Sequence, residues 1–135
     1  MKLTMNFTLE ELVRSDTAKR LNLDNTPDQD SLAKLGRLAR EILQPVRNRW
    51  EKPITVTSGY RSRAVNKAVG GVATSQHMSG EAADIVCDNN RGLYRLMKQM
   101  IKDGEITVGQ LLDENNGSWI HVSLPNAKWR NYTNP

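Results

Sequence analysis

The chain has 135 residues, of which 38% are hydrophobic and 25% charged, and its formal net charge is +4. This length and composition predict one folded domain spanning residues 1–135 with its own hydrophobic core, and they argue against disorder. No run of about 18 apolar residues occurs, so we expect no membrane span. The basic residues are scattered among acidic ones rather than grouped in blocks, and we therefore expect no nucleic-acid binding.

The first residues of the chain, Met1–Phe7, lack the apolar segment of a secretory signal. We therefore expect the protein to be cytoplasmic when synthesised. The single cysteine, Cys87, cannot form an internal disulfide and is expected to be a buried, inert thiol. Nothing in the sequence predicts a repeat or an interdomain linker, and we expect a monomer.

Helices are predicted for most of the first fifty residues. Thr8 and Glu11 occupy the two ends of a capping box, which predicts a short helix from about residue 9 to 14. A second short helix is expected at about 17–21. Apolar residues then recur at helical spacing over 31–50, and Pro45 removes a backbone donor, so this long helix should kink or break near the proline.

The rest of the chain is predicted to hold the strands, at 54–57, 82–86 and 118–124, with one or two more in 105–114. A helix is expected between about residue 90 and Gly104, where the glycine ends it. We expect 66–74 to be a loop and 125–135 to be irregular. This order of elements favours an α+β fold, with a small, mainly antiparallel sheet packed with helices.

Both histidines of the chain lie in segments that suit a metal site. His77 precedes Asp84 by seven residues, with small residues just before the acid, and His121 lies in the predicted strand 118–124. Taken singly, either histidine is more simply explained as a hydrogen-bonded structural residue. Two imidazoles and one carboxylate, however, form the ligand set of a catalytic zinc site that leaves a fourth position for water. We therefore hypothesise that the three residues hold one zinc ion per chain.

Four motifs in order along the chain carry a resemblance to a known family. The stretch Ser75–Asp84 contains every fixed residue of the pattern S-x-H-x-x-G-x-A-x-D, and the other motifs are Ser-Gly-Tyr-Arg-Ser at 58–62, Val-Gly-Gly at 69–71 and Trp-Ile-His-Val at 119–122. From about residue 7 to 124 the chain resembles the zinc D-Ala-D-Ala carboxypeptidases and the phage L-alanyl-D-glutamate endopeptidases. These share the hedgehog/DD-peptidase fold of the LAS metallopeptidases.

The resemblance implies His77, Asp84 and His121 as the ligands of one zinc ion. It also implies a peptidoglycan hydrolase that cuts stem or cross-link peptides of the bacterial cell wall. Such an enzyme acts as a D,D-carboxypeptidase or as an L-alanyl-D-glutamate endopeptidase. A phage endolysin of this kind reaches the cell wall after holin-type release.

Two further residues receive roles from the resemblance. Arg61 is expected to hold a substrate carboxylate or to polarise the scissile carbonyl, since a guanidinium grips a carboxylate with paired hydrogen bonds. The alternative for Arg61 is a structural or surface ion pair. Ser75 is expected to orient the segment of His77 by a hydrogen bond and to border the substrate.

The sequence departs from the family at one important position. Active relatives have an acid three residues before the last histidine, where this chain has Ser118, and serine cannot serve as the general base. With a two-residue hairpin turn, Glu114 pairs with Trp119 and shares the face of His121. A loop one residue longer places Asp113 on that face instead. We predict Glu114 as the base, with Asp113 or no base as the alternatives.

Two other classes of function remain open. One is a zinc-binding module with the peptidase fold that has lost catalysis, and Ser118 is its best evidence. The other is a structural or tail-associated viral component in which the fold serves binding. The sequence does not decide which peptide bond an active enzyme would cut.

Overall fold

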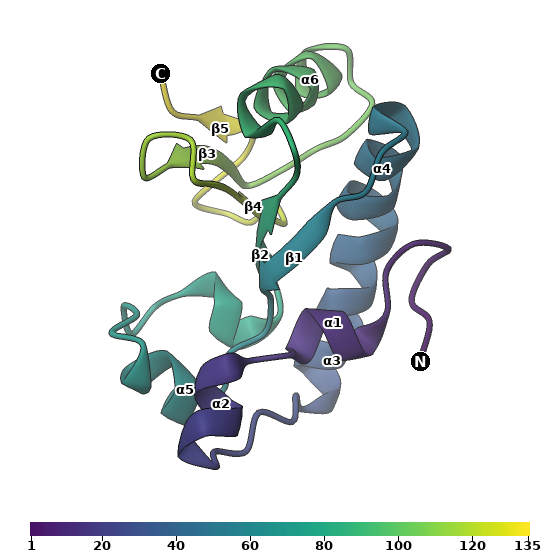
Figure 1. Cartoon of the computed structure of the whole chain (residues 1–135). Helices are drawn as coiled ribbons and strands as arrows, with labels where there is room; N and C mark the ends of the chain where they lie inside the picture. Colours follow the sequence, from purple (N-terminus) through teal and green to yellow (C-terminus); the bar gives the residue numbers. More distant parts are fainter.

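The computed structural model describes all 135 residues (Figure 1). In chain order, the elements are α1 (Leu9–Val13), α2 (Asp16–Leu21), α3 (Gln29–Leu38), the π-helical turn η1 (Ala39–Leu43), α4 (Gln44–Trp50), β1 (Thr55–Ser58), α5 (Arg63–Ala68), the 3-10 turn η2 (Gln76–Ser79), β2 (Ala82–Val86), α6 (Asn90–Lys102), β3 (Gln110–Glu114), β4 (Trp119–Ser123) and β5 (Tyr132–Thr133). The predicted α+β class is confirmed. None of the helices is both long enough and apolar enough to cross a membrane.

The five strands form one sheet in the order β1-β2-β4-β3-β5. Three of the four pairings are antiparallel, and β5 alone runs parallel to its neighbour β3. The prediction of a mainly antiparallel sheet is therefore confirmed. In the β3–β4 hairpin, Glu114 pairs with Trp119 and Asp113 pairs with Ile120, as predicted for the shorter turn. The alternative prediction, in which a loop one residue longer places Asp113 on the face of His121, is wrong.

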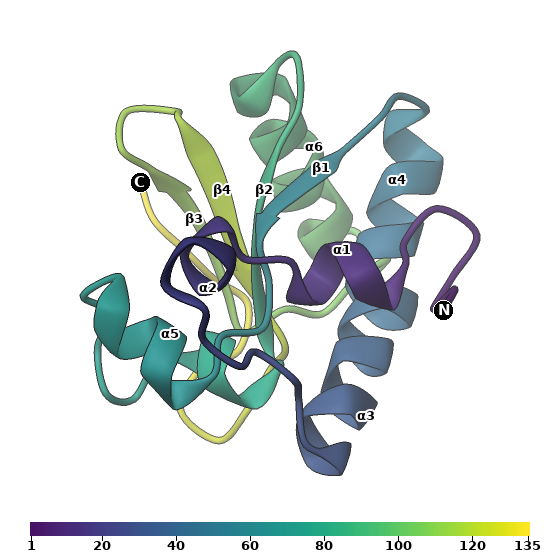
Figure 2. The same ribbon diagram turned by 60° about the horizontal axis from the view of Figure 1, so that its bottom comes forward.

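The hydrophobic core lies between one face of the sheet and the helices α3, α4 and α6. Each central strand sends alternate side chains into it, such as Ile85 from β2 and Ile120 from β4, both with no exposed surface. α6 lies behind the strands in Figure 2, contacts β3 and β4, and contributes Met97 to the same core. Because the strand period is two, the intervening residues of β2 and β4 face the other way.

The long predicted helix is helical throughout but changes its winding before the proline. The backbone N–H of Gln44 donates to the carbonyl of Ala39, five residues earlier, and this defines the π-helical turn η1. Pro45 follows directly, and it has no N–H to offer to the preceding turn. The predicted irregularity near Pro45 is thus a widened turn, and α3 and α4 continue as one column in Figure 1.

Two expectations for the second half of the chain need correction. The expected loop 66–74 begins within α5, whose cap Ser62 accepts a hydrogen bond from the backbone N–H of Val65 at 3.3 Å. Six residues are too few to show a helical period, so the sequence pattern missed this helix. The region 105–114 holds one strand, β3, as expected, whereas the tail that we expected to be irregular contains β5. β5 has only two residues and is a strand because it pairs with β3, so its own sequence carries no strand pattern.

Asn25 joins three segments that surround the end of β1. Its side-chain amide donates to the carbonyls of Val13, at 2.7 Å, and Tyr60, at 3.1 Å. Its carbonyl oxygen accepts the backbone N–H of Ser62 at 2.7 Å. This side chain therefore holds both neighbours of Arg61 in place.

We predict that Asn25→Ala lowers the free energy of unfolding by about 2–3 kcal/mol, because three partly buried backbone groups lose their partner. Urea denaturation followed by circular dichroism measures the change. Asn48→Ala is the control, since exposed Asn48 accepts one hydrogen bond from Gln44, and it should cost less than about 0.5 kcal/mol. Equal effects of the two substitutions would contradict the clamping role of Asn25.

Candidate metal centre

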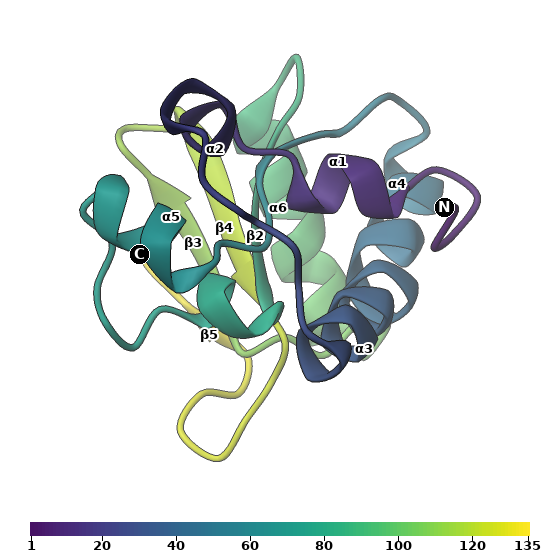
Figure 3. The same cartoon turned by 90° about the horizontal axis from the view of Figure 1, so that it is seen from below.

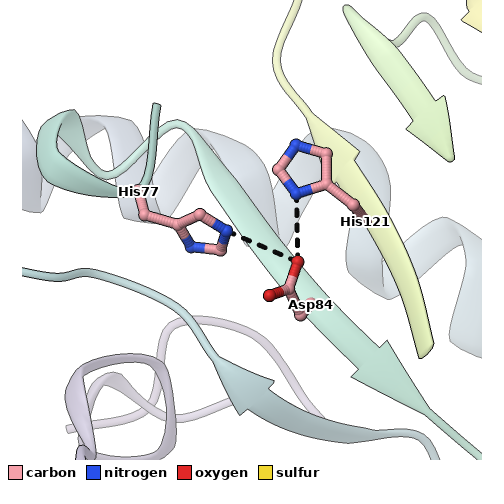
Figure 4. A group of neighbouring side chains, drawn as sticks. All are labelled: His77, Asp84 and His121. Atoms are coloured by element: carbon pink, nitrogen blue, oxygen red, sulfur yellow. Dashed lines mark hydrogen bonds and ion pairs between the residues drawn. The ribbon is translucent and has the colours of Figure 1, made fainter. Parts of the chain in front are cut away.

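Asp84 and His121 face each other across two neighbouring strands. They are register partners in the antiparallel pair β2–β4, and the pairs on either side of them, such as Ile85 with Ile120, point into the core. The two polar side chains therefore emerge together on the face of the sheet that the core leaves free. In Figure 4, the Nδ1 atom of His121 points at Asp84, and the Asp84 Oδ1 atom accepts its hydrogen bond at 3.0 Å.

His77 completes the cluster from outside the sheet. Its Nε2 atom lies 3.4 Å from the same oxygen, Oδ1 of Asp84 (Figure 4). One potential ligand atom from each of His77, Asp84 and His121 lies within 4.8 Å of the other two. The structure thus brings together the three residues that the sequence singled out as metal ligands. His77 itself sits on the 3-10 turn η2, whereas we had expected a loop.

Hydrogen bonds fix the position and orientation of the His77 ring. The hydroxyl of Ser75 accepts the backbone N–H of His77 at 3.2 Å, which caps η2 as the sequence predicted for this serine. The Nδ1 atom lies 2.7 Å from the carbonyl oxygen of Gly59. A carbonyl oxygen only accepts, so Nδ1 carries a hydrogen, and Nε2 is the ring nitrogen turned toward Asp84.

Gly59 is required here by a close approach of two backbone segments. A Cβ atom at this position would lie 2.1 Å from the carbonyl oxygen of Leu12. The same carbonyl accepts the backbone N–H of Tyr60 at 2.8 Å, so α1 holds the end of β1 directly. Gly59 therefore positions the carbonyl that orients His77.

Asp84 is an ionised ligand before any metal arrives. Burial disfavours its charged form, but the hydrogen bonds with His121 and His77 outweigh burial and hold the pKa of its carboxyl well below the usual range. Two imidazole nitrogens and one carboxylate oxygen are the donors that zinc prefers, and three protein ligands leave a position for water. The donor set therefore fits a catalytic zinc site by its chemistry.

An open cleft of about 560 Å³ adjoins the cluster. Its floor comes from β3 and β4 and includes His121 and Glu114, which the register places on one face of the hairpin. One wall is formed by 72–76, the segment that leads into η2, and the other by the C-terminal segment 126–129. Figure 3 shows η2 and the chain that follows β4 at the same end of the sheet.

The other acid considered from the sequence lies on the opposite side of the sheet. Asp113 pairs with buried Ile120 and contributes its negative charge to the environment of Tyr94 on α6, where burial and that charge raise the pKa of the phenol. Ser118 lies in the hairpin turn, and its hydroxyl donates to the carbonyl of Asn115 at 2.6 Å. Glu114 lines the cleft, whereas Asp113 and Ser118 do not.

Arg61 lies behind the wall formed by 72–76. Its guanidinium is half-buried and donates a hydrogen bond to the hydroxyl of Ser75 at 3.3 Å, while its Nε atom is buried without a partner. Burial lowers the pKa of the guanidinium, and the charge of Asp84 opposes that effect. Arg61 makes no ion pair, so the alternative of a structural ion pair is not what the structure shows.

Sequence reasoning missed the wall of the cleft that follows β4. Asn126, Lys128 and Trp129 all line the cleft, yet the sequence suggested only an irregular tail. Neither periodicity nor a spacing pattern connects these residues to His121. The adjacent lysine and tryptophan were the only local signal, and such a pair is common on protein surfaces.

A sheet face that carries two imidazoles and an ionised carboxylate beside an open cleft has the arrangement of a metal-dependent hydrolytic site. A family model described as "Peptidase M15" matches residues 5–123, and the chain belongs to the peptidase M15 family. Over 35 residues the chain is 54% identical to a zinc D-Ala-D-Ala carboxypeptidase of Streptomyces albus G. That match covers 26% of this chain and 14% of the relative. The predicted family is confirmed.

We predict that the purified chain binds one zinc ion and that His77→Ala weakens binding by more than about 100-fold. Loss of a ligand should exceed the roughly 10–100-fold cost of losing an outer hydrogen-bond partner. Competition with a chromogenic chelator measures the affinity. The control is Asp113→Asn, which removes an acid from the other face of the sheet and should leave binding unchanged. Wild-type affinity in His77→Ala would show that the ligand set is wrong.

Proposed function

We propose that the chain is a zinc-dependent peptidase that cleaves stem or cross-link peptides of bacterial peptidoglycan. The observation that carries the proposal is the cluster of His77, Asp84 and His121 beside a cleft that Glu114 also lines. Membership of the peptidase M15 family supports peptide hydrolysis. The relative from Streptomyces albus G, by its name a zinc D-Ala-D-Ala carboxypeptidase, supports zinc and a cell-wall peptide as the substrate.

In this proposal His77, Asp84 and His121 hold the zinc ion through Nε2, a carboxylate oxygen and a ring nitrogen. When bound, zinc lowers the pKa of its water toward about 7 and polarises the scissile carbonyl. The surrounding residues keep the ligands ready for this task. The Gly59 carbonyl sets the tautomer of His77, and Ser75 fixes the turn that carries the ring.

Glu114 is proposed as the general base. Its carboxylate takes a proton from the attacking water as the oxygen adds to the scissile carbonyl. The same proton is then given to the leaving amine as the carbon–nitrogen bond breaks. Glu114 suits this role because the β3–β4 register places it on the face of His121 and because it lines the cleft.

Arg61 is proposed to hold a carboxylate of the substrate. Its half-buried guanidinium has no acidic partner, and its one side-chain hydrogen bond reaches Ser75 in the cleft wall. A carboxylate that approaches this wall would gain a charge-assisted bond with the guanidinium. Ser75 would then have two roles: it borders the bound substrate, and its hydroxyl caps the turn that carries His77.

A second candidate function is a zinc-binding module without catalysis. The observation that favours it is Ser118, which stands where active members of the family have an acid and whose hydroxyl is bonded within the hairpin turn. In this case Glu114 would be one polar residue of a binding cleft. The two candidates share the metal and differ in whether a bond is cut.

We predict that the zinc-loaded protein releases new amine ends from peptidoglycan fragments, detected by derivatisation and mass spectrometry. Glu114→Gln should lower the rate by about 10²–10⁴-fold, because a positioned base contributes that much, and should keep its zinc. Asp113→Asn is the matched control on the next residue of the strand and should keep the wild-type rate. If zinc-loaded protein releases no amine while an active relative does so in parallel, the non-catalytic module is the correct reading.

A further inference from the structure

The C-terminal segment builds one wall of the cleft, and this wall lies beyond the residues that match the family model. The match to the peptidase M15 family ends at residue 123, whereas Asn126, Lys128 and Trp129 lie beyond it. They face the floor of the cleft, which carries His121 and Glu114. This wall stands beside His121 and Glu114, in a position to contact a bound substrate.

Backbone hydrogen bonds hold this segment at both ends. After β4, the N–H of Leu124 donates to the carbonyl of Glu81 at 2.8 Å. Before β5, the N–H of Asn131 donates to the carbonyl of Val108 at 2.6 Å, and its side-chain oxygen accepts the N–H of Val108 at 2.9 Å. The wall is therefore tied to the residue that precedes β2 and to the chain leading into β3 (Figure 3).

The tip of the segment is also ordered from within. The side-chain oxygen of Asn126 accepts the backbone N–H groups of Lys128 and Trp129, both at 2.8 Å, and its own N–H donates to the carbonyl of Trp129 at 3.0 Å. The Trp129 ring packs against Tyr132 with a centroid separation of 5.1 Å. A ligand would therefore meet a formed surface and pay little entropy to order it.

The charge on this wall has no partner in the protein. The Lys128 ammonium lies 5.5 Å from the Trp129 ring centroid and makes no ion pair. Among the residues that line the cleft, Lys128 is the one lysine or arginine. The opposite wall, 72–76, is uncharged, and Arg61 reaches it only through Ser75. The cleft thus has one free cation on each side of its floor, Arg61 behind one wall and Lys128 in the other.

We propose that Lys128 and Trp129 form an anchoring site that selects substrate peptides with a second free carboxylate, in addition to the group held by Arg61. The ammonium binds this carboxylate, and the indole covers the adjoining apolar part of the peptide. The inference rests on the proposed peptidase function and defines its substrate more closely, as a peptide with carboxylates on both sides of the metal centre. A charge-assisted hydrogen bond of this kind gives roughly a tenfold preference.

The test uses two stem pentapeptides that differ in one group. In one, the D-glutamyl residue has a free α-carboxylate, and in the other this group is a carboxamide. Wild-type, zinc-loaded protein should cleave the acid with a kcat/KM about tenfold higher than the amide. Lys128→Met should lower kcat/KM for the acid to about that for the amide, and should keep one zinc.

Lys98→Met is the matched control. Lys98 lies 5.5 Å from the ring centroid of Tyr94 on α6, so it forms the same kind of lysine–aromatic pair on the far side of the sheet. This variant loses the same charge and should keep the preference for the acid. A preference that persists in Lys128→Met, or that disappears equally in Lys98→Met, would overturn the proposal.

Binding separates failure of the anchoring site from failure of the enzyme. Zinc-loaded Glu114→Gln should bind the acid peptide about tenfold more tightly than the amide in calorimetry, whether or not wild-type protein turns either peptide over. Equal binding of the two peptides overturns the anchoring site even if both are hydrolysed. Unequal binding without hydrolysis supports the anchoring site and rejects the catalytic reading.

Discussion

The antiparallel register of β2 against β4 is the constraint on which the rest of the site depends. It sets Asp84 directly opposite His121, and it does so because the neighbouring pairs, Ala83 with Val122 and Ile85 with Ile120, are buried in the core. A shift by one residue would turn these apolar side chains outward and bury the polar pair. The core therefore fixes the register that places two of the three candidate metal ligands opposite each other.

Backbone constraints also position the residues on both sides of the cluster. On one side, the β3–β4 hairpin carries Glu114 to the face of His121 and sends Asp113 to the face of α6. On the other side, the close approach of α1 to Gly59 places the carbonyl that orients His77. Two backbone constraints, one in a strand pair and one at a strand end, thus prepare the ligands and the proposed base together. Mutations that loosen either constraint should weaken zinc binding and turnover in parallel.

Much of this arrangement could be predicted from the sequence, and the parts that could not have a common physical cause. The strands β1, β2 and β4 were predicted, a capping box identified α1, and a two-residue hairpin turn gave the correct register for Glu114. α5 was missed because six residues show no periodicity, and β5 because it is specified by its partner strand. The clamp of Asn25 and the cleft wall at Lys128 depend on contacts between residues far apart in sequence, so no local pattern encodes them.

The central claim is that one zinc ion binds where β2, β4 and η2 meet. A crystal structure of zinc-loaded protein, with diffraction data collected on both sides of the zinc absorption edge, tests it most directly. The account predicts a single anomalous peak about 2.0–2.2 Å from Nε2 of His77, a carboxylate oxygen of Asp84 and a ring nitrogen of His121. A strong peak elsewhere, or a stoichiometric zinc ion that lacks one of these three ligands, would contradict it.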